Sequence, residues 1–392
     1  MAMIKVLSIF GTRPEAIKMA PIVRALEKDA RFSSRLCVTH QHSDLLDQML
    51  SLFELVPDHD LAVMREGQGL THITTAVLQG LDPVLDGERP DWVLVHGDTT
   101  TTFAATLAAF YAGVPVGHVE AGLRTQNLSS PWPEEANRQI VGRLASLHFA
   151  PTQAARDNLL LENIDAERIL ITGNTVVDAL YVMREKLADD CALRQTTTDA
   201  FSFLDPQKKL ILVTGHRREN LGTALSSLCD GLEQIAARND VEIYFAVHPN
   251  PQVRSVVECK LAGVPNIFLG APLAYPALLW ALERAALVIT DSGGIQEEAP
   301  SFGTPVLVTR DQTERREALL SGAVRLVGTD ALRLVSAAHD ALAQPAHTAD
   351  SGLMRNPYGD GSAARRILDA LAEHSASPST DKSFAFDFTS FG

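Results

Sequence analysis

Short apolar runs alternate with helical patterns along most of the chain. In the first half, the apolar runs predict strands at Val6–Phe10, Leu36–Thr39, Trp92–Val95, Val116–Val119, His148–Ala150 and Ile169–Ile171. Apolar residues spaced three and four apart predict helices between them, at Glu15–Lys28, Leu45–Phe53, Leu70–Leu85, Thr101–Tyr111, Glu135–Leu147 and Ala154–Leu161. This alternation indicates a parallel sheet with helices on both faces.

The alternation stops after a helix predicted at about Val176–Leu187 and then begins again. Residues 188–207 mix acids, threonines and phenylalanines without a helical period, and we interpret them as a hinge. Further strands are predicted at Lys209–Val213, Ile243–Val247, Ile267–Leu269, Leu287–Thr290, Val306–Val308 and Val324–Val327. We therefore predict an α/β fold of two Rossmann-like domains whose parallel sheets face each other across a cleft.

The predicted organisation has four parts. These are an N-terminal domain at 1–187, a linker at 188–207, a C-terminal domain at 208–372 and a flexible tail at 373–392. A final helix at about Ser362–Ala372 can pack on either domain. The tail begins rich in Ser, Thr and Pro, which is typical of disorder. Its last residues carry a phenylalanine series: Phe384, Phe386, Phe388 and Phe391.

Composition restricts the possible partners. With 34 Lys and Arg against 48 Asp and Glu, the formal charge is −14, which argues against a surface for nucleic acid or anionic membranes. The four cysteines are scattered and form no CxxC pair, so they fit neither a zinc site nor a disulfide framework. A reducing cytoplasm is the simplest setting. No segment is long and apolar enough to span a membrane.

The stretch Ala285–Leu307 combines a buried strand, a glycine turn, a short helix and a second apolar run. Gly293 and Gly294, beside Ser292, would let a bulky anion approach the backbone, and the start of the helix suits phosphate. Glu298, one turn into the helix, could accept hydrogen bonds from ribose hydroxyls. A Gly-Gly pair alone is more typical of an ordinary tight turn with a solvated glutamate, so this interpretation depends on the other motifs.

A second motif follows the first strand and begins a helix. Within it, Arg13 is suited to clamp a pyrophosphate, and Lys18 could supply a point charge. Cations near a helix N-terminus are unfavourable unless an anion lies close by. The alternative is a pair of ordinary surface cations.

Three carboxylates stand at the ends of predicted strands or at a helix start. Asp98 follows one strand within His-Gly-Asp-Thr-Thr-Thr-Thr, and Glu120 follows the next within His-Val-Glu-Ala-Gly-Leu-Arg-Thr. Glu134 opens a helix after Pro-Trp-Pro. Helix capping could account for Asp98 and Glu134. An acid at the end of a central strand, however, lies partly out of water and needs partners or a function.

The second half has a basic triplet, His216-Arg217-Arg218, after its first strand. It is a candidate phosphate site, with His216 the best placed. The histidines show no metal-ligand spacing, and neither GxGxxG nor GxxxxGK[ST] follows any strand. We therefore expect no metal site, and neither a dinucleotide-dependent redox enzyme nor a P-loop NTPase.

Taken together, these motifs resemble those of the non-hydrolysing UDP-N-acetylglucosamine 2-epimerases, which have the two-domain GT-B architecture. The resemblance runs in order from about Lys5 to about Leu371. It rests on the segments GTRPEAIKMAP, HGDTTTT, GHVEAGLRT, PWPEEANR, TGNTVVDAL, VTGHRREN, DSGGIQEEAPSFGTPVLV, TERREA and NPYGDG.

The resemblance implies reversible conversion of UDP-N-acetylglucosamine to UDP-N-acetylmannosamine without a cofactor, by elimination and re-addition of UDP through a 2-acetamidoglucal. It implies that the catalytic residues are Asp98, Glu120, Glu134 and His216. It implies that the substrate-binding residues are Arg13, Lys18, His216, Ser292, Gly293, Gly294, Glu298 and Arg315. Members of the family are commonly homodimers, and their product usually feeds surface polysaccharide synthesis.

Three other functions share parts of this pattern. A hydrolysing epimerase would release free N-acetylmannosamine and UDP. A GT-B glycosyltransferase would use the same nucleotide site but would not need the acids of the first domain. A nucleotide-sugar sensor would need the nucleotide site without Asp98, Glu120 and Glu134.

Overall fold

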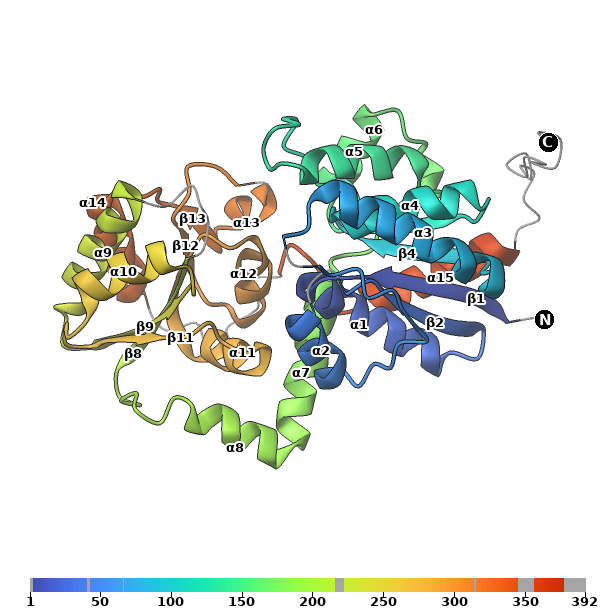
Figure 1. The fold of residues 1–392 in the computed structure, drawn as a ribbon. Helices are drawn as coiled ribbons and strands as arrows, with labels where there is room; N and C mark the ends of the chain where they lie inside the picture. The colour runs from blue at the N-terminus through green and yellow to red at the C-terminus, as the bar shows by residue number, and fades with distance from the viewer. Residues whose placement is uncertain are drawn as a thin grey trace. The chain divides into compact units, whose positions relative to one another are not determined.

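The computed structural model describes residues 3–40, 43–65, 67–215, 222–313, 315–344 and 356–376, which form two compact units (Figure 1). Unit 1 comprises the described residues up to Ala179 together with those from Tyr358 onward, and unit 2 comprises those of Leu180–Pro357. Unit 2 is therefore inserted in the sequence of unit 1, and the chain passes from one unit to the other twice.

Unit 1 contains a parallel sheet with the strand order β3-β2-β1-β4-β5-β6-β7 among the described residues. Its strands are β1 Ile4–Phe10, β2 Phe32–Val38, β3 His59–Asp60, β4 Trp92–His96, β5 Val116–Val119, β6 Leu147–Ala150 and β7 Ile169–Ile171. Its helices are α1 Arg13–Lys28, α2 Ser43–Leu52, α3 Leu70–Glu88, α4 Thr100–Tyr111, α5 Glu134–Leu144, α6 Gln153–Leu161 and α15 Ala363–Ala376, with a short 3₁₀ helix at Ala166–Arg168. α1, α2 and α15 lie on one face of the sheet and α3, α4 and α5 on the other (Figure 1).

Unit 2 contains a second parallel sheet, with the order β10-β9-β8-β11-β12-β13 in the described chain. Its strands are β8 Lys209–Gly215, β9 Val241–Val247, β10 Ile267–Gly270, β11 Ala285–Thr290, β12 Val306–Val308 and β13 Val324–Leu326. Its helices are α8 Cys191–Asp199, α9 Thr223–Ala236, α10 Pro251–Leu261, α11 Tyr275–Arg284, α12 Gly293–Glu298, α13 Arg316–Leu320 and α14 Ala331–Ala343, with a 3₁₀ helix at Ala299–Phe302. α7, Thr175–Asp189, begins in unit 1 and continues into unit 2.

The two sheets confirm the predicted α/β fold with parallel strands. In both sheets the central strands are buried on both faces, so their sequences are nearly continuous apolar runs. All seven residues of β9, Val241–Val247, are buried. Each flanking helix packs an apolar stripe of its surface against one face of the sheet.

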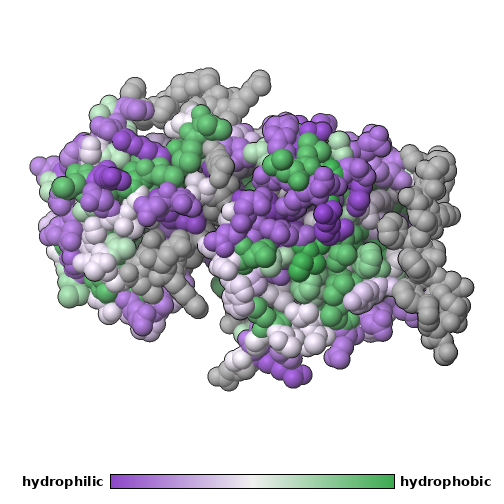
Figure 2. Space-filling model, turned by 90° about the horizontal axis from the view of Figure 1, so that it is seen from above, coloured by the Kyte–Doolittle hydropathy of each residue, from purple (hydrophilic) through white to green (hydrophobic). Residues whose placement is uncertain are grey.

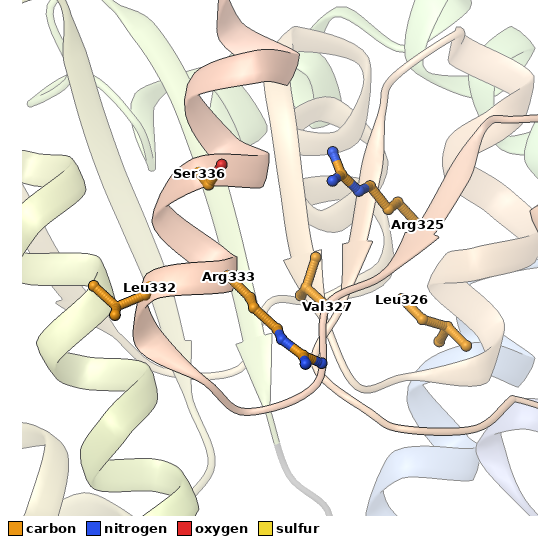
Figure 3. Close-up of a pocket in the computed structure, with 6 residues that line it drawn as sticks. All are labelled: Arg325, Leu326, Val327, Leu332, Arg333 and Ser336. Atoms are coloured by element: carbon orange, nitrogen blue, oxygen red, sulfur yellow. The ribbon is translucent and has the colours of Figure 1, made fainter.

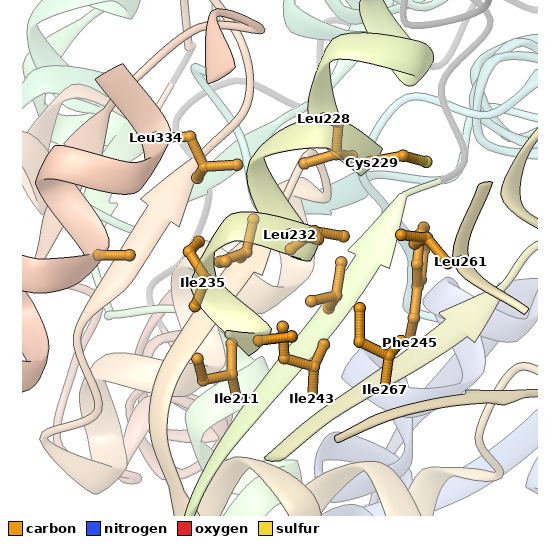
Figure 4. Packing of buried hydrophobic residues seen from close by; sticks show 14 of the residues in the cluster. Ile211, Leu228, Cys229, Leu232, Ile235, Ile243, Phe245, Leu261, Ile267 and Leu334 are labelled. Carbon is orange, nitrogen blue, oxygen red and sulfur yellow. The ribbon is translucent and has the colours of Figure 1, made fainter. Parts of the chain in front are cut away.

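The main core of unit 2 lies between its sheet and the helices α9, α10 and α14 (Figure 4). Leu232 and Ile235 of α9 are fully buried, and they pack over Ile211 of β8 and Ile243 of β9. The spacing of Leu228, Leu232 and Ile235 along α9 is the helical period that a helix on a sheet requires.

Residues 188–207, predicted as a linker, contain structure that packs on unit 2. Asp190 caps α8 by accepting a hydrogen bond from the Leu193 amide at 2.9 Å. After α8, the ring of Phe201 stacks on Trp280 at 4.5 Å, and Phe203 lies 4.8 Å from Phe268. The division between the units falls earlier than the sequence suggests, within α7.

The last helix, α15, packs on α1 and belongs to unit 1. Its first turn is held by the carboxylate of Asp178 on α7, which accepts hydrogen bonds from the amides of Ala363 and Ala364 at 3.2 and 2.9 Å. Near its other end, Ser375 accepts a hydrogen bond from the Trp92 indole at 2.9 Å. The helix extends past residue 372, and the phenylalanine series of the tail lies outside the described residues.

Hydrophilic and apolar patches lie side by side on the face drawn in Figure 2. Several large apolar side chains are exposed, among them Phe110 and Tyr111 of α4 and Trp132. None of the helices in the described chain combines the length and apolar character needed to cross a membrane.

Candidate functional site

Three of the sequence motifs meet at the carboxyl edge of the sheet in unit 1. β1, β4 and β5 are neighbours in the sheet, and each motif follows one of these strands. Gly97 donates its amide to the carbonyl of Val119 at 2.9 Å, so Asp98 and Glu120 begin at the same edge. Ligands of open parallel sheets bind at this edge.

Glu15 joins the turn after β1 to the turn after β4. Its Oε2 accepts hydrogen bonds from the amides of Gly11 and Thr12 at 3.0 and 2.8 Å, which forms a capping box at the start of α1. Its Oε1 accepts from the hydroxyls of Thr99 and Thr102 at 2.7 and 3.1 Å. The Glu15 side chain is only 1% exposed. Its buried carboxylate therefore fixes the two turns relative to each other.

Glycine is required at position 11 because two threonine hydroxyls lie close to its Cα atom. A Cβ at this position would lie 1.9 Å from Oγ1 of Thr39 and 2.8 Å from Oγ1 of Thr101. The two threonine hydroxyls are hydrogen bonded to each other at 2.9 Å. Part of the threonine run that follows Asp98 therefore serves the packing of the turns.

Asp98 is held by an arginine from α5. Oδ2 of Asp98 accepts from Nε of Arg138 at 2.8 Å and lies 2.6 Å from its Nη2, while Asn137 donates to the Asp98 carbonyl at 2.9 Å. Arg138 also contacts Glu135 at 3.3 Å. Burial acts to raise the pKa of Glu135, but hydrogen bonds from the Thr125 amide and the Gln139 side chain, with the Arg138 charge, lower it overall. The Asp98 carboxylate retains a side-chain exposure of 24%.

Glu120 contacts polar side chains from α1, from β4 and from the residue before α7. Its Oε2 is paired with Nζ of Lys18 from α1, accepts from Nδ2 of Asn174 at 2.7 Å, and lies 3.7 Å from Nε2 of His96 on β4. Glu120 itself has a positive φ of 63°, which is uncommon for a residue with a side chain. Lys18 is buried against this carboxylate and not on the surface.

Glu134 is the first residue of α5 and is half-buried. Its neighbour Glu135 is fully buried and accepts the amides of Thr125 and Gln126 at 3.0 and 3.2 Å. The two adjacent acids therefore differ in role. Glu135 stabilises the loop after Glu120, whereas Glu134 keeps access to solvent.

Two buried histidines lie on adjacent strands of the sheet in unit 1. His118 on β5 is paired in register with His148 on β6, and Nε2 of His118 contacts the Gly97 carbonyl at 2.7 Å. Burial lowers the pKa of His118 to about 3 and that of His148 to about 3. Neither ring nitrogen of His148 has a hydrogen-bond partner among the described residues, and no group of described His, Cys, Asp and Glu is arranged to hold a metal ion.

In unit 2, the strand, turn and helix predicted at Ala285–Leu307 form as β11, the turn, α12 and β12. The hydroxyl of Thr290 accepts the Ser292 amide at 3.0 Å and is hydrogen bonded to the Thr214 hydroxyl of β8 at 2.7 Å. A Cβ at Gly294 would meet no described atom within 4 Å, so packing among these residues does not require glycine there. Glu298, at the end of α12, is 5% exposed.

Arg315 reaches the same turn. A Cβ at Gly293 would lie 2.8 Å from Cζ of Arg315, so this glycine admits the guanidinium group. Nε of Arg315 donates to Oε1 of Glu297 at 3.0 Å, and both side chains are buried. The turn therefore carries a positive group whose position is fixed by a carboxylate of α12. His216, Arg217 and Arg218 lie outside the described residues.

A shallow pocket elsewhere in unit 2 contains none of the predicted site residues. Its volume is about 440 Å³, and it lies where β13 leads into α14 (Figure 3). Its lining residues are Arg325, Leu326, Val327, Leu332, Arg333 and Ser336. Arg325 is paired with Asp340 at 3.3 Å.

Sequence reasoning missed four residues that hold the site: Glu15, Arg138, Asn174 and Glu297. The capping-box spacing of Thr12 and Glu15 would have identified Glu15 as a residue bonded to the turn. The spacing of Glu135 and Arg138 places them on one helix face. The contacts of Asn174 and Glu297 with distant residues have no local sequence signal.

Comparisons with known proteins bear on this arrangement. The family model described as UDP-N-acetylglucosamine 2-epimerase matches residues 24–372. The chain belongs to this family. The UDP-N-acetylglucosamine 2-epimerase of Salmonella typhimurium is 54% identical over 374 residues, which cover 95% of this chain and 100% of that protein.

Solved structures of family members have the same fold. The epimerase of Neisseria meningitidis bound to UDP-N-acetylglucosamine is similar with a TM-score of 0.88 and 45% identity, covering 94% of this chain and 100% of that one. The epimerase of Methanocaldococcus jannaschii in complex with UDP-N-acetylglucosamine and UDP gives a TM-score of 0.80 with 32% identity, covering 94% of this chain and 100% of that chain. The two-sheet architecture is thus the GT-B-like fold of the family.

Proposed function

We propose that this protein interconverts UDP-N-acetylglucosamine and UDP-N-acetylmannosamine by eliminating UDP and adding it back. A base takes the proton from C2 of the sugar, the C1–O bond to UDP breaks, and a C1–C2 double bond forms. UDP leaves as an anion, and the product is a 2-acetamidoglucal. Re-addition of UDP at C1, with a proton delivered to the opposite face of C2, gives the epimer.

The observation that carries the proposal is the placement of Asp98 and Glu120 after adjacent strands of one sheet. Proton removal from a carbon without a neighbouring carbonyl needs a base, and the cationic character that develops at C1 needs an adjacent negative charge. The hydrogen bonds of Asp98 and Glu120 to Arg138 and Asn174 orient the two carboxylates before substrate arrives. Glu134, half-buried on α5, is the third acid that we assign to these proton transfers.

We assign UDP binding to the turn and helix of unit 2. Gly293 and Gly294 offer backbone donors at the start of α12, Ser292 offers its hydroxyl, Arg315 offers a guanidinium, and Glu298 offers acceptors for the ribose. Arg13 and Lys18 of α1, with His216, are assigned to the substrate phosphates or to the site around them. The relatives that were solved with UDP-N-acetylglucosamine and UDP support a nucleotide sugar as the ligand class.

Incubation of the purified protein with UDP-N-acetylglucosamine in D₂O, followed by NMR, tests the proposal. We expect UDP-N-acetylmannosamine to form and deuterium to appear at C2 of both nucleotide sugars, because the base exchanges its proton with solvent. The Asp98→Asn variant, after it has been shown to bind UDP, serves as the control. Free N-acetylmannosamine as the main product would instead identify a hydrolysing enzyme, and unchanged substrate would refute both.

A further inference from the structure

Asn174 stands immediately before α7 and is 2% exposed. Its side-chain Oδ1 accepts a hydrogen bond from the Val176 amide at 3.0 Å, and its backbone amide donates to the carbonyl of Tyr358 at 2.6 Å. Its Nδ2 donates to Oε2 of Glu120 at 2.7 Å. Its backbone carbonyl accepts from the Val177 amide at 3.1 Å, so all four polar groups of this buried residue have defined partners.

These contacts fix which end of the amide faces Glu120. Because Oδ1 is engaged by an N–H group of the first turn of α7, the NH₂ end must point to the carboxylate. A flipped amide would set an oxygen against the carboxylate and leave the Val176 amide without this acceptor. The start of α7 thus determines the orientation of a donor at the candidate catalytic carboxylate.

The backbone of Glu120 makes such support necessary. A non-glycine residue at a φ of 63° is strained and persists only where the surroundings hold it. The charged or titratable groups near this carboxylate include Lys18 from α1, His96 from β4 and His118 from β5. Asn174 is a neutral donor beside them, so it can orient Glu120 without contributing a charge.

We propose that Asn174 is a positioning residue that orients Glu120 and stabilises its charged form during epimerisation. This inference rests on the proposed function, since it concerns the carboxylate to which proton transfer is assigned. A hydrogen bond to a charged acceptor is worth more than one between neutral groups, so its loss should lower kcat by about 10- to 100-fold. KM should change little, because Asn174 is assigned no contact with substrate.

Asn174→Asp separates positioning from a structural role. Aspartate keeps an oxygen that can accept from the Val176 amide and is a favourable residue at a helix start. It removes the donor, however, and places a second carboxylate against Glu120, which disfavours the charged form of the pair. We expect the limb of the pH–kcat profile that reports Glu120 to move to higher pH. Asn174→Ser, which retains a capping oxygen without a charge or a reaching donor, should lower kcat without a comparable shift.

Thermal unfolding and the Kd for UDP are measured for each variant. We expect the Kd to stay close to the wild-type value, and the stability to fall more in Asn174→Asp, where two buried carboxylates meet, than in Asn174→Ser. A variant with an unchanged pH–kcat profile and unchanged kcat would overturn the proposal. Parallel losses of kcat and thermal stability in both variants, without a shift of the profile, would also overturn it by showing a structural role alone. Failure of the wild-type protein to epimerise would refute the proposed function itself, so the two failures are distinguishable.

Discussion

Asp98 has the geometry of an oriented carboxylate with one side open to solvent. Asp98→Asn keeps the shape of the side chain but removes its charge, so the contact with Arg138 weakens and no base or charge remains. We expect kcat for epimerisation to fall by at least about 100-fold, in the range for the loss of general acid–base catalysis, while the Kd for UDP changes little. Steady-state kinetics and calorimetric titration with UDP measure the two effects.

The control for this substitution is Asp86→Asn on the exposed surface of α3 in the same unit. It should leave both kcat and the UDP affinity unchanged. A fully active Asp98→Asn variant would exclude this carboxylate from the chemistry.

Glu298 is expected to act in binding and not in turnover. Because a buried carboxylate that accepts ribose hydroxyls makes charge-assisted hydrogen bonds, Glu298→Ala should weaken UDP binding by about 10- to 100-fold. Glu258→Ala on the exposed face of α10 is the matched control, since Glu258 is paired only at the surface with Arg254 at 2.7 Å. Unchanged affinity in Glu298→Ala would show that the ribose assignment is wrong.

At the scale of elements, the pattern of apolar runs predicted nearly every strand because parallel strands are buried on both faces. β3 was missed because it has only two residues, His59 and Asp60. α8 was missed because only Thr197 is buried among the residues of this helix, which leaves no apolar period to detect. The hydrophobic pattern thus predicts the segments that pack against a core, and it does not detect the segments that remain on the surface.

The site was less predictable than the strands for a related reason. Asp98, Glu120 and Glu134 could be proposed from their positions at strand ends and a helix start. Their supports could not, because the contacts of Arg138 with Asp98 and of Asn174 with Glu120 join residues 40 and 54 positions apart. Such pairs become visible only when the sheet order is known.

The packing of α9 permits a prediction at the same scale. Leu232→Ala removes a fully buried side chain from the core of unit 2 and leaves a cavity beneath the helix, which should cost about 2–5 kcal/mol of stability. Hydrogen exchange of the amides of β8 and β9 reports this unit by itself. Leu332→Ala, at a side chain that is 72% exposed, should alter the exchange by less than about 0.5 kcal/mol. Equal effects of the two substitutions would contradict this account of the core.

At the scale of the whole molecule, acid should destabilise unit 1 through its buried histidines. The pKa of His118 and that of His148 are about 3 in the folded state, against an ordinary value of 6.5. The unfolded chain therefore binds more protons below pH 6.5, and stability falls as the pH drops from there towards 3, by up to about 1.4 kcal/mol per pH unit for each histidine.

His148→Leu should remove the contribution of one histidine to the loss of stability in acid. The free energy of unfolding, followed by calorimetry between pH 7 and pH 5, should fall less steeply in the variant than in the wild type. His339→Gln, at an exposed position on α14, should leave the slope unchanged. A wild-type slope in His148→Leu would show that His148 is charged in the folded protein.

The insertion of unit 2 within the sequence of unit 1 sets an order for synthesis of the chain. Residues 358–376 are synthesised after unit 2, yet they supply α15 and the Tyr358 carbonyl that bonds to Asn174. Because domains fold as units during synthesis, unit 2 can form its core while unit 1 still lacks its last helix. The contact that anchors Asn174 can form only after residue 358 has been synthesised, so a nascent chain that stalls before this residue would carry the candidate catalytic acids without that contact.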